Sequence, residues 1–122
     1  MRFLATPTTL LLFATTPCAA ACHVDHFNYF HGSEVPATMH ASSGAPCLMK
    51  FTIGGGSNID SVGVTKQASH GAASWNGSTA YPGVLYRSSS GYKGQDEFSC
   101  DIVGPSHRST NPASVRVSVD VK

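Results

Sequence analysis

Residues 91–104 read GYKGQDEFSCDIVG, and their pattern gives the strongest indication of local structure in the chain. The first four residues combine two glycines with a tyrosine and a lysine, which is typical of a tight turn. After the turn, large apolar side chains return at every second position, at Phe98, Cys100 and Ile102. Side chains two residues apart point to the same face of a β-strand. The stretch therefore predicts a turn followed by a strand with one buried face.

The same period of two recurs on both sides of this stretch. The two longest runs each place four apolar side chains on one face of their own strand. They are Cys47, Met49, Phe51 and Ile53 in the first run, and Val115, Val117, Val119 and Val121 in the run near the C-terminus. Shorter strands are predicted within residues 59–68, 72–75, 79–81 and 84–87. Asn76-Gly77 predicts a hairpin because both residues tolerate a positive φ. About seven short strands without a helical period between them predict an all-β antiparallel sandwich.

Composition limits the size of the protein and the kinds of partner it can bind. The chain has 122 residues, of which 41% are hydrophobic and 12% are charged, and its formal net charge is +1. This length and hydrophobicity favour one folded domain. A nearly neutral chain without a run of basic residues offers no attraction to a polyanion, so no nucleic-acid partner is expected.

The first twenty-one residues predict export from the cytoplasm. Arg2 precedes an apolar stretch around Leu10–Phe13, and small residues follow Pro17 up to Ala21. This order is typical of a secretory signal peptide, and the apolar stretch is shorter than the roughly 20 residues that a membrane-spanning helix needs. We therefore expect residues 1–21 to be removed, the mature chain to carry no transmembrane segment, and the protein to be secreted or periplasmic.

Cysteine usage is consistent with an oxidising compartment. Cys47 and Cys100 both lie on inward faces of predicted strands, 53 positions apart, and are expected to form a disulfide. A bridge over a loop of that length would contribute about 4 kcal/mol at most. Cys22 then has no partner. The preceding Ala19-Ala20-Ala21 is similar to the lipobox of bacterial lipoproteins, so Cys22 is a candidate for lipid attachment; cleavage one residue later and a free N-terminal thiol are the alternatives.

At these residues the chain resembles the bacterial immunoglobulin-like and cadherin-like repeat modules of exported proteins. The segments that carry the resemblance are Ser69-His70-Gly71, residues 84–87 (VLYR), residues 91–98 (GYKGQDEF) and the alternating valines of residues 115–121. The sequence departs from the family pattern at Arg87, where proline is usual. The resemblance implies an immunoglobulin-like antiparallel β-sandwich over residues 46–122 with one inter-sheet disulfide, preceded by a His-rich lead-in over residues 22–45. Such modules usually act as stalks, spacers or binding surfaces.

The lead-in contains the main concentration of potential metal ligands. His23, Asp25, His26 and His31 lie within nine residues of one another, with Cys22 beside them. Neutral imidazoles suit zinc or copper, so an extracytoplasmic metal-binding protein is the alternative function. A solvated His-rich segment without bound metal is the simpler interpretation of the same residues.

The remaining candidate residues suggest binding rather than catalysis. Asp96 is expected to cap its own turn through backbone N–H groups. Trp75, Tyr81 and Tyr86 surround the predicted hairpin and are candidates for an aromatic surface that contacts a protein or glycan of the cell envelope. No nucleophile, base and orienting residue can be assembled from the sequence. We therefore expect a non-enzymatic module without a cofactor.

Overall fold

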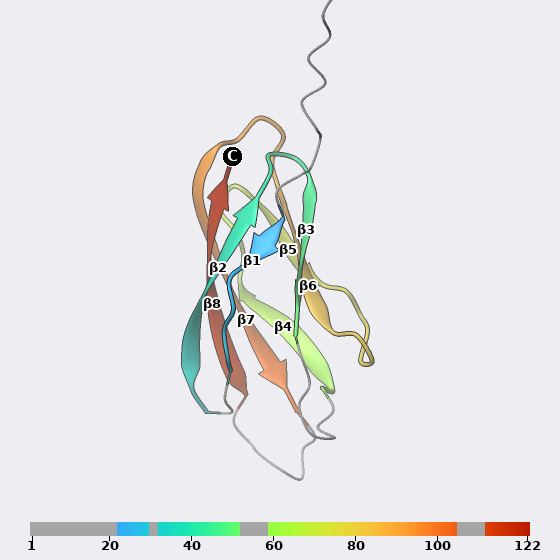
Figure 1. Ribbon diagram of the computed structural model, residues 1–122. Helices are drawn as coiled ribbons and strands as arrows, with labels where there is room; N and C mark the ends of the chain where they lie inside the picture. Colours follow the sequence, from blue (N-terminus) through green and yellow to red (C-terminus); the bar gives the residue numbers. More distant parts are fainter. Residues whose placement is uncertain (1–21, 30–31, 52–58, 105–111) are drawn as a thin grey trace, which may run out of the picture.

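A computed structural model describes residues 22–29, 32–51, 59–104 and 112–122. These residues form no helix and eight strands, which in chain order are β1 His23–Val24, β2 Glu34–Ala41, β3 Pro46–Lys50, β4 Ser61–Lys66, β5 Gly71–Trp75, β6 Gly83–Ser88, β7 Gly94–Val103 and β8 Ala113–Val121. The strands form two sheets, one in the order β1-β2-β8-β7-β4 and one in the order β3-β6-β5 (Figure 1). The expected all-β class is confirmed. The expected signal peptide, Ile53 and His31 lie outside the described residues.

The alternation read from the sequence places the core. Phe98, Cys100 and Ile102 of β7 are fully buried, and so are the four odd-numbered valines of β8. The two strands pair antiparallel, with Phe98 opposite Val117. Tyr86 of β6 stacks on Phe98 with ring centroids 5.7 Å apart, which joins the second sheet to this face. Buried residues of both sheets therefore form one hydrophobic core.

The neighbour of β8 on its other side was not expected. β2 pairs with β8 in parallel along its whole length, from Glu34 opposite Ser114 to Ala41 opposite Val121. The last strand is therefore antiparallel to one neighbour and parallel to the other. Residues 34–41, which the sequence assigned to a lead-in, lie inside the five-stranded sheet.

Pro36 fits within β2 because of the direction in which its backbone points. Thr38 accepts a hydrogen bond from Asp25 on the β1 side, whereas Ala41 accepts one from Lys122 on the β8 side. Since successive residues of a strand point their backbone groups to opposite edges, Pro36 faces the β1 side with Thr38. Its missing N–H therefore removes no hydrogen bond to β8, which is the condition under which strands tolerate proline.

The disulfide differs from the expected one. Cys47 is bonded to Cys22, with Cα atoms 5.2 Å apart, and Cys100 is a free, buried thiol. The expected Cys47–Cys100 bridge is wrong. Cys47 lies on β3, at the edge of its sheet and within reach of the N-terminal segment, whereas Cys100 lies on β7 in the interior of the other sheet. The inward orientation of both cysteines on their strands was therefore not sufficient to predict a bond between them.

The same bond corrects the expected role of Cys22. Its sulfur is joined to Cys47 and cannot also carry a thioether-linked lipid. The bond gives Cys22 a structural role, and a lipid-linked form of the same thiol would have to lack this bond. The bond ties the start of the described chain to β3.

Candidate functional site

The connection between β5 and β6 projects beyond the strands and is held by a dense set of hydrogen bonds (Figure 1, yellow to gold at the right). We call residues 75–83 the β5–β6 tip. The side-chain oxygen of Asn76 accepts hydrogen bonds from the N–H groups of Ser78 (3.0 Å) and Gly83 (3.3 Å), and its side-chain nitrogen donates to the Tyr81 carbonyl (2.9 Å). The Tyr81 N–H donates to the Ser78 hydroxyl at 2.9 Å. These bonds fix the path of the tip from Asn76 to Tyr81, and the Phe51 N–H, which donates to the Pro82 carbonyl at 2.9 Å, fixes its far end.

Asn76-Gly77 begins this connection but does not form a two-residue turn. Gly77 has a φ of 77°, but Asn76 lacks the positive φ that the two-residue turn also needs, and the strands resume only at Gly83. Residues 79–81, which were expected to be a strand, therefore lie in the connection. The longer loop results from the hydrogen bonds of Asn76, which close a wider ring with Tyr81 and Gly83.

The three aromatic residues assigned to a binding surface have different positions. Tyr81 is 84% exposed. Trp75 is partly buried against the core, and its indole nitrogen is buried without a hydrogen-bond partner among the described residues. Tyr86 is fully buried and cannot contact a partner, so its assignment to the surface is wrong. The period of two explains this error, because Tyr86 shares its face of β6 with the buried Val84.

The hydroxyl of Tyr86 donates a 2.7 Å hydrogen bond to Asp96, which is itself only 7% exposed. Asp96 also accepts hydrogen bonds from the backbone N–H groups of Ser69 (2.9 Å), His70 (3.1 Å) and Glu97 (2.9 Å). Asp96 therefore caps backbone N–H groups, as expected. Two of the three belong to the turn at residues 69–70, and only the N–H of Glu97 lies next to Asp96 in the sequence. Sequence spacing gave no signal for this distant turn.

These contacts determine the ionisation of both side chains. Burial alone would raise the pKa of Asp96, but the hydrogen bonds from Tyr86 and the three N–H groups outweigh it and hold the pKa below its ordinary value. Burial, followed by the hydrogen bond to the Asp96 carboxylate, raises the pKa of Tyr86. Asp96 is thus an anion whose acceptor positions are filled by the protein itself.

A shallow depression of about 310 Å³ lies where the turn at residues 69–70 meets β7 and β8. It is lined by Ser69, His70, Gln95, Asp96, Glu97 and Ser118. The His70 ring stacks on Tyr92 with centroids 4.0 Å apart. Because Asp96 is saturated and Glu97 pairs with Lys66 at 3.3 Å, the two carboxylates that line the depression are already engaged within the protein.

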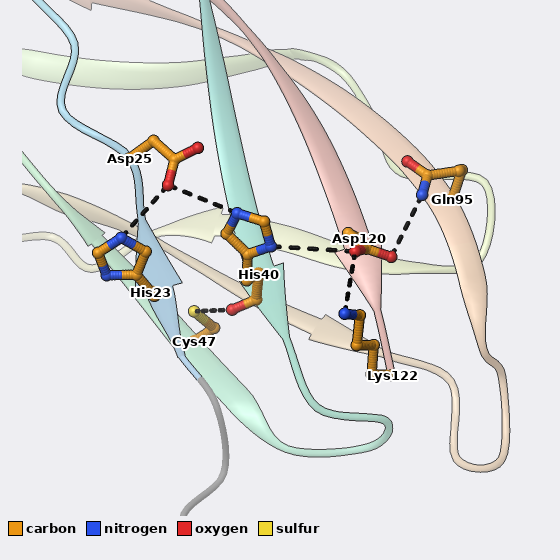
Figure 2. A network of polar contacts seen from close by, with 7 residues as sticks. All are labelled: His23, Asp25, His40, Cys47, Gln95, Asp120 and Lys122. Atoms are coloured by element: carbon orange, nitrogen blue, oxygen red, sulfur yellow. Dashed lines mark hydrogen bonds and ion pairs between the residues drawn. The ribbon is translucent and has the colours of Figure 1, made fainter.

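A second polar network lies at the N-terminal strand (Figure 2). The carboxylate of Asp25 is 3.2 Å from a nitrogen of His23 and 3.4 Å from a nitrogen of His40, and it lies between the two rings. His40 also approaches Asp120 of β8 at 3.9 Å, and Asp120 accepts a hydrogen bond from Gln95. The network connects the N-terminal segment, β2, β8 and β7.

This network contains two of the proposed metal ligands, His23 and Asp25, and a further histidine, His40, that was not among them. His23 and Asp25 meet, and His40 joins them because it lies opposite His23 in the β1–β2 pairing. That pairing depends on tertiary structure, since 17 positions separate the two histidines. His26 is exposed and forms no part of the network, and His31 is outside the described residues. Within the described ranges, no group of three or more His, Cys, Asp or Glu side chains is arranged to hold a metal ion.

Comparison of the chain with protein-family models, with curated proteins and with solved structures finds no match in any of the three. In the described ranges, no helix has the length and hydrophobicity needed to cross a bilayer. The function is therefore inferred from the geometry of the chain itself.

Proposed function

We propose that this protein is an exported, non-catalytic module with an immunoglobulin-like fold that binds a component of the cell envelope through its β5–β6 tip. The observation that carries the proposal is the 84% exposure of Tyr81 on a hydrogen-bonded loop. A large, rigid aromatic side chain offers contact area at low entropic cost when it binds a partner. Among the large hydrophobic side chains of the described residues, Tyr81 is the most exposed.

The strand order supports the immunoglobulin-like part of the proposal. If β3 to β8 are taken as strands B to G of that fold, the sheet β3-β6-β5 corresponds to B, E and D, and the run β8-β7-β4 corresponds to G, F and C. The disulfide departs from the pattern of antibody domains, in which strands B and F are bridged, because Cys47 is bonded to Cys22. The strand order is a stronger argument than the disulfide, because it depends on six strands whereas the disulfide depends on two residues.

Sedimentation with isolated envelope fragments tests the proposed function. The purified protein is expected to co-sediment in a saturable manner, and Tyr81→Ala is expected to reduce the bound fraction. Val103→Ala removes a different exposed apolar side chain and serves as the matched control. Equal binding by the wild type and Tyr81→Ala, or no binding by the wild type, would contradict a binding role for the tip and leave only a spacer.

Metal binding is the second candidate, and the approach of His23, Asp25 and His40 is the observation in its favour. The two histidine nitrogens lie 3.2 Å and 3.4 Å from one Asp25 oxygen, but within the described ranges no group of three or more His, Cys, Asp or Glu side chains is arranged to hold a metal ion. We therefore expect titration with Cu²⁺ or Zn²⁺ to show no tight stoichiometric complex. A one-to-one complex that is lost in His40→Ala would favour this second function instead.

A further inference from the structure

The chemistry of the β5–β6 tip restricts the kind of partner it can bind. From Gln67 to Tyr86 the sequence contains no Asp, Glu, Lys or Arg, and the tip itself consists of small, hydroxyl, amide and aromatic residues. Thr79 and Asn76 are exposed beside Tyr81. The β3–β6 pairing places Lys50 opposite Gly83, at the base of the tip. The tip is therefore an aromatic and hydrogen-bonding surface with little charge.

The extent of exposed apolar surface argues against a protein partner. Stable protein interfaces bury about 800 Å² on each side, around an apolar centre. In the described residues the large exposed hydrophobic side chains are Tyr81, Leu85 and Val103, which lie on the tip, in the middle of β6 and at the end of β7. Leu85 and Val103 are only 40% and 41% exposed, so Tyr81 is the one of the three that is mostly exposed, and it offers a single ring rather than an interface.

A sugar ring needs this smaller set of contacts. One face of a pyranose presents C–H bonds that pack on an aromatic ring, and its edge presents hydroxyl groups that exchange hydrogen bonds with neutral amides and hydroxyls. Small-ligand sites commonly combine an apolar or aromatic surface with a few fixed polar groups. Hydrogen bonds from the Asn76 side chain to the Tyr81 carbonyl and from the Tyr81 N–H to the Ser78 hydroxyl hold the Tyr81 backbone in place before binding, which lowers the entropic cost of association.

We infer that the β5–β6 tip binds a neutral saccharide, with the ring of Tyr81 stacked on a sugar ring and the polar groups of the tip facing its hydroxyls. This inference rests on the proposed function and names the class of its ligand. Lys50 at the base of the tip makes a negatively charged saccharide the main competing ligand class.

The single tryptophan of the chain provides the readout, because Trp75 begins the tip. The purified protein is titrated with neutral hexasaccharides of glucose and of N-acetylglucosamine, and Trp75 fluorescence and Tyr81 ring proton shifts are recorded. We expect saturable changes with at least one of the two. Loss of the ring in Tyr81→Ala should weaken binding about tenfold or more, whereas Tyr81→Phe, which keeps the ring, should stay within about threefold of the wild type.

Control variants separate this inference from the proposed function. Val103→Ala should bind as the wild type does, and unchanged circular dichroism of Tyr81→Ala should show that it folds. Envelope binding that depends on Tyr81 but is abolished by protease treatment of the fragments would overturn the saccharide inference and leave the binding function intact. So would binding confined to acidic oligosaccharides and lost in Lys50→Ala. Envelope binding that does not depend on Tyr81 would instead contradict the proposed function itself.

Discussion

A single carboxylate joins distant parts of the chain at the residue scale. Asp96 of β7 receives the Tyr86 hydroxyl from β6 and two N–H groups from the turn that leads into β5. The N–H groups of the turn, from Ser69 and His70, donate to this carboxylate. The geometry of the turn therefore depends on a side chain that lies 26 to 27 positions later in the sequence. The conformation at residues 69–70 is thus a tertiary property.

Replacing Asp96 by Asn should destabilise the fold. The asparagine amide keeps one acceptor oxygen, but its NH₂ group replaces the other oxygen and cannot accept a hydrogen bond. Some of the four donors that now bond to Asp96 would therefore be buried without an acceptor. We expect a loss of about 2 kcal/mol in the free energy of unfolding at pH 7, measured by urea denaturation. Tyr86→Phe removes one hydrogen bond and keeps the ring on Phe98, so it should cost about 1 kcal/mol.

The acid dependence of stability should follow from the same carboxylate. The pKa of Asp96 is lower in the folded than in the unfolded protein, so its contribution is present above about pH 4 and is lost as the pH falls through the folded-state pKa. Urea denaturation between pH 7 and pH 2 should show a smaller loss in Asp96→Asn than in the wild type. Parallel curves for the two proteins would contradict this assignment.

Cys100 should be chemically inert while the protein is folded. Its side chain is fully buried, and burial, with a smaller effect of the nearby Asp101 charge, raises the pKa of the thiol to about 12. Alkylation at pH 8 followed by mass spectrometry of the peptide containing Cys100 should show no modification in native protein and complete modification in denaturant. Rapid labelling in the native state would mean that β7 is open to solvent.

At the scale of elements, the β5–β6 tip depends on Asn76 much as the turn at residues 69–70 depends on Asp96. Asn76 supplies an acceptor oxygen and a donor nitrogen within the eight-residue stretch 76–83, so the tip is organised mainly locally. Its exposed Tyr81 is therefore presented by a short segment held mainly by its own hydrogen bonds, with one further bond from the Phe51 N–H to the Pro82 carbonyl.

Asn76→Ala should loosen the tip while leaving the core intact. We expect faster amide hydrogen exchange at Ser78 and Gly83 and a loss of about 1 kcal/mol in stability. Thr79→Ala removes an exposed side chain of the same loop and is the matched control. Unchanged exchange at both amides in Asn76→Ala would show that the strands, rather than Asn76, hold the loop.

At the scale of the whole molecule, the Cys22–Cys47 bond links the N-terminal segment to the three-stranded sheet, while β1 and β2 belong to the five-stranded one. The backbone oxygen of His40 lies 3.8 Å from the Cys47 sulfur, so the bond sits where the two sheets approach one another. It therefore connects both layers near one edge.

Loss of this bond should lower global stability. The bond closes a loop of 25 positions, for which the chain-entropy model gives about 3.5 kcal/mol. Cys22→Ser should be less stable than the wild type by up to this amount in urea denaturation. A reducing agent should bring the wild type to the level of the variant and leave the variant unchanged. A disulfide-linked peptide pair that joins Cys47 to Cys100 would contradict the observed connectivity.

The sequence by itself determined which faces are buried and therefore the all-β class. A period of two depends only on local geometry, so the runs that contain Phe98, Met49 and Val117 identified inward positions before any partner strand was known. The same local rule missed the length of the β5–β6 connection, because the hydrogen bonds of Asn76 reach farther than a two-residue turn.

Only the tertiary structure decided which buried or polar groups meet. The pairing of Cys22 with Cys47, the approach of His40 to His23, and the capping of residues 69–70 by Asp96 all depend on how strands are ordered within and between the sheets. The exposure of Tyr81 alongside the burial of Tyr86 belongs to the same category. The physical reason is that periodicity fixes the direction of a side chain relative to its own strand, whereas contacts depend on which strand lies opposite, and that is set by the folding of the whole chain.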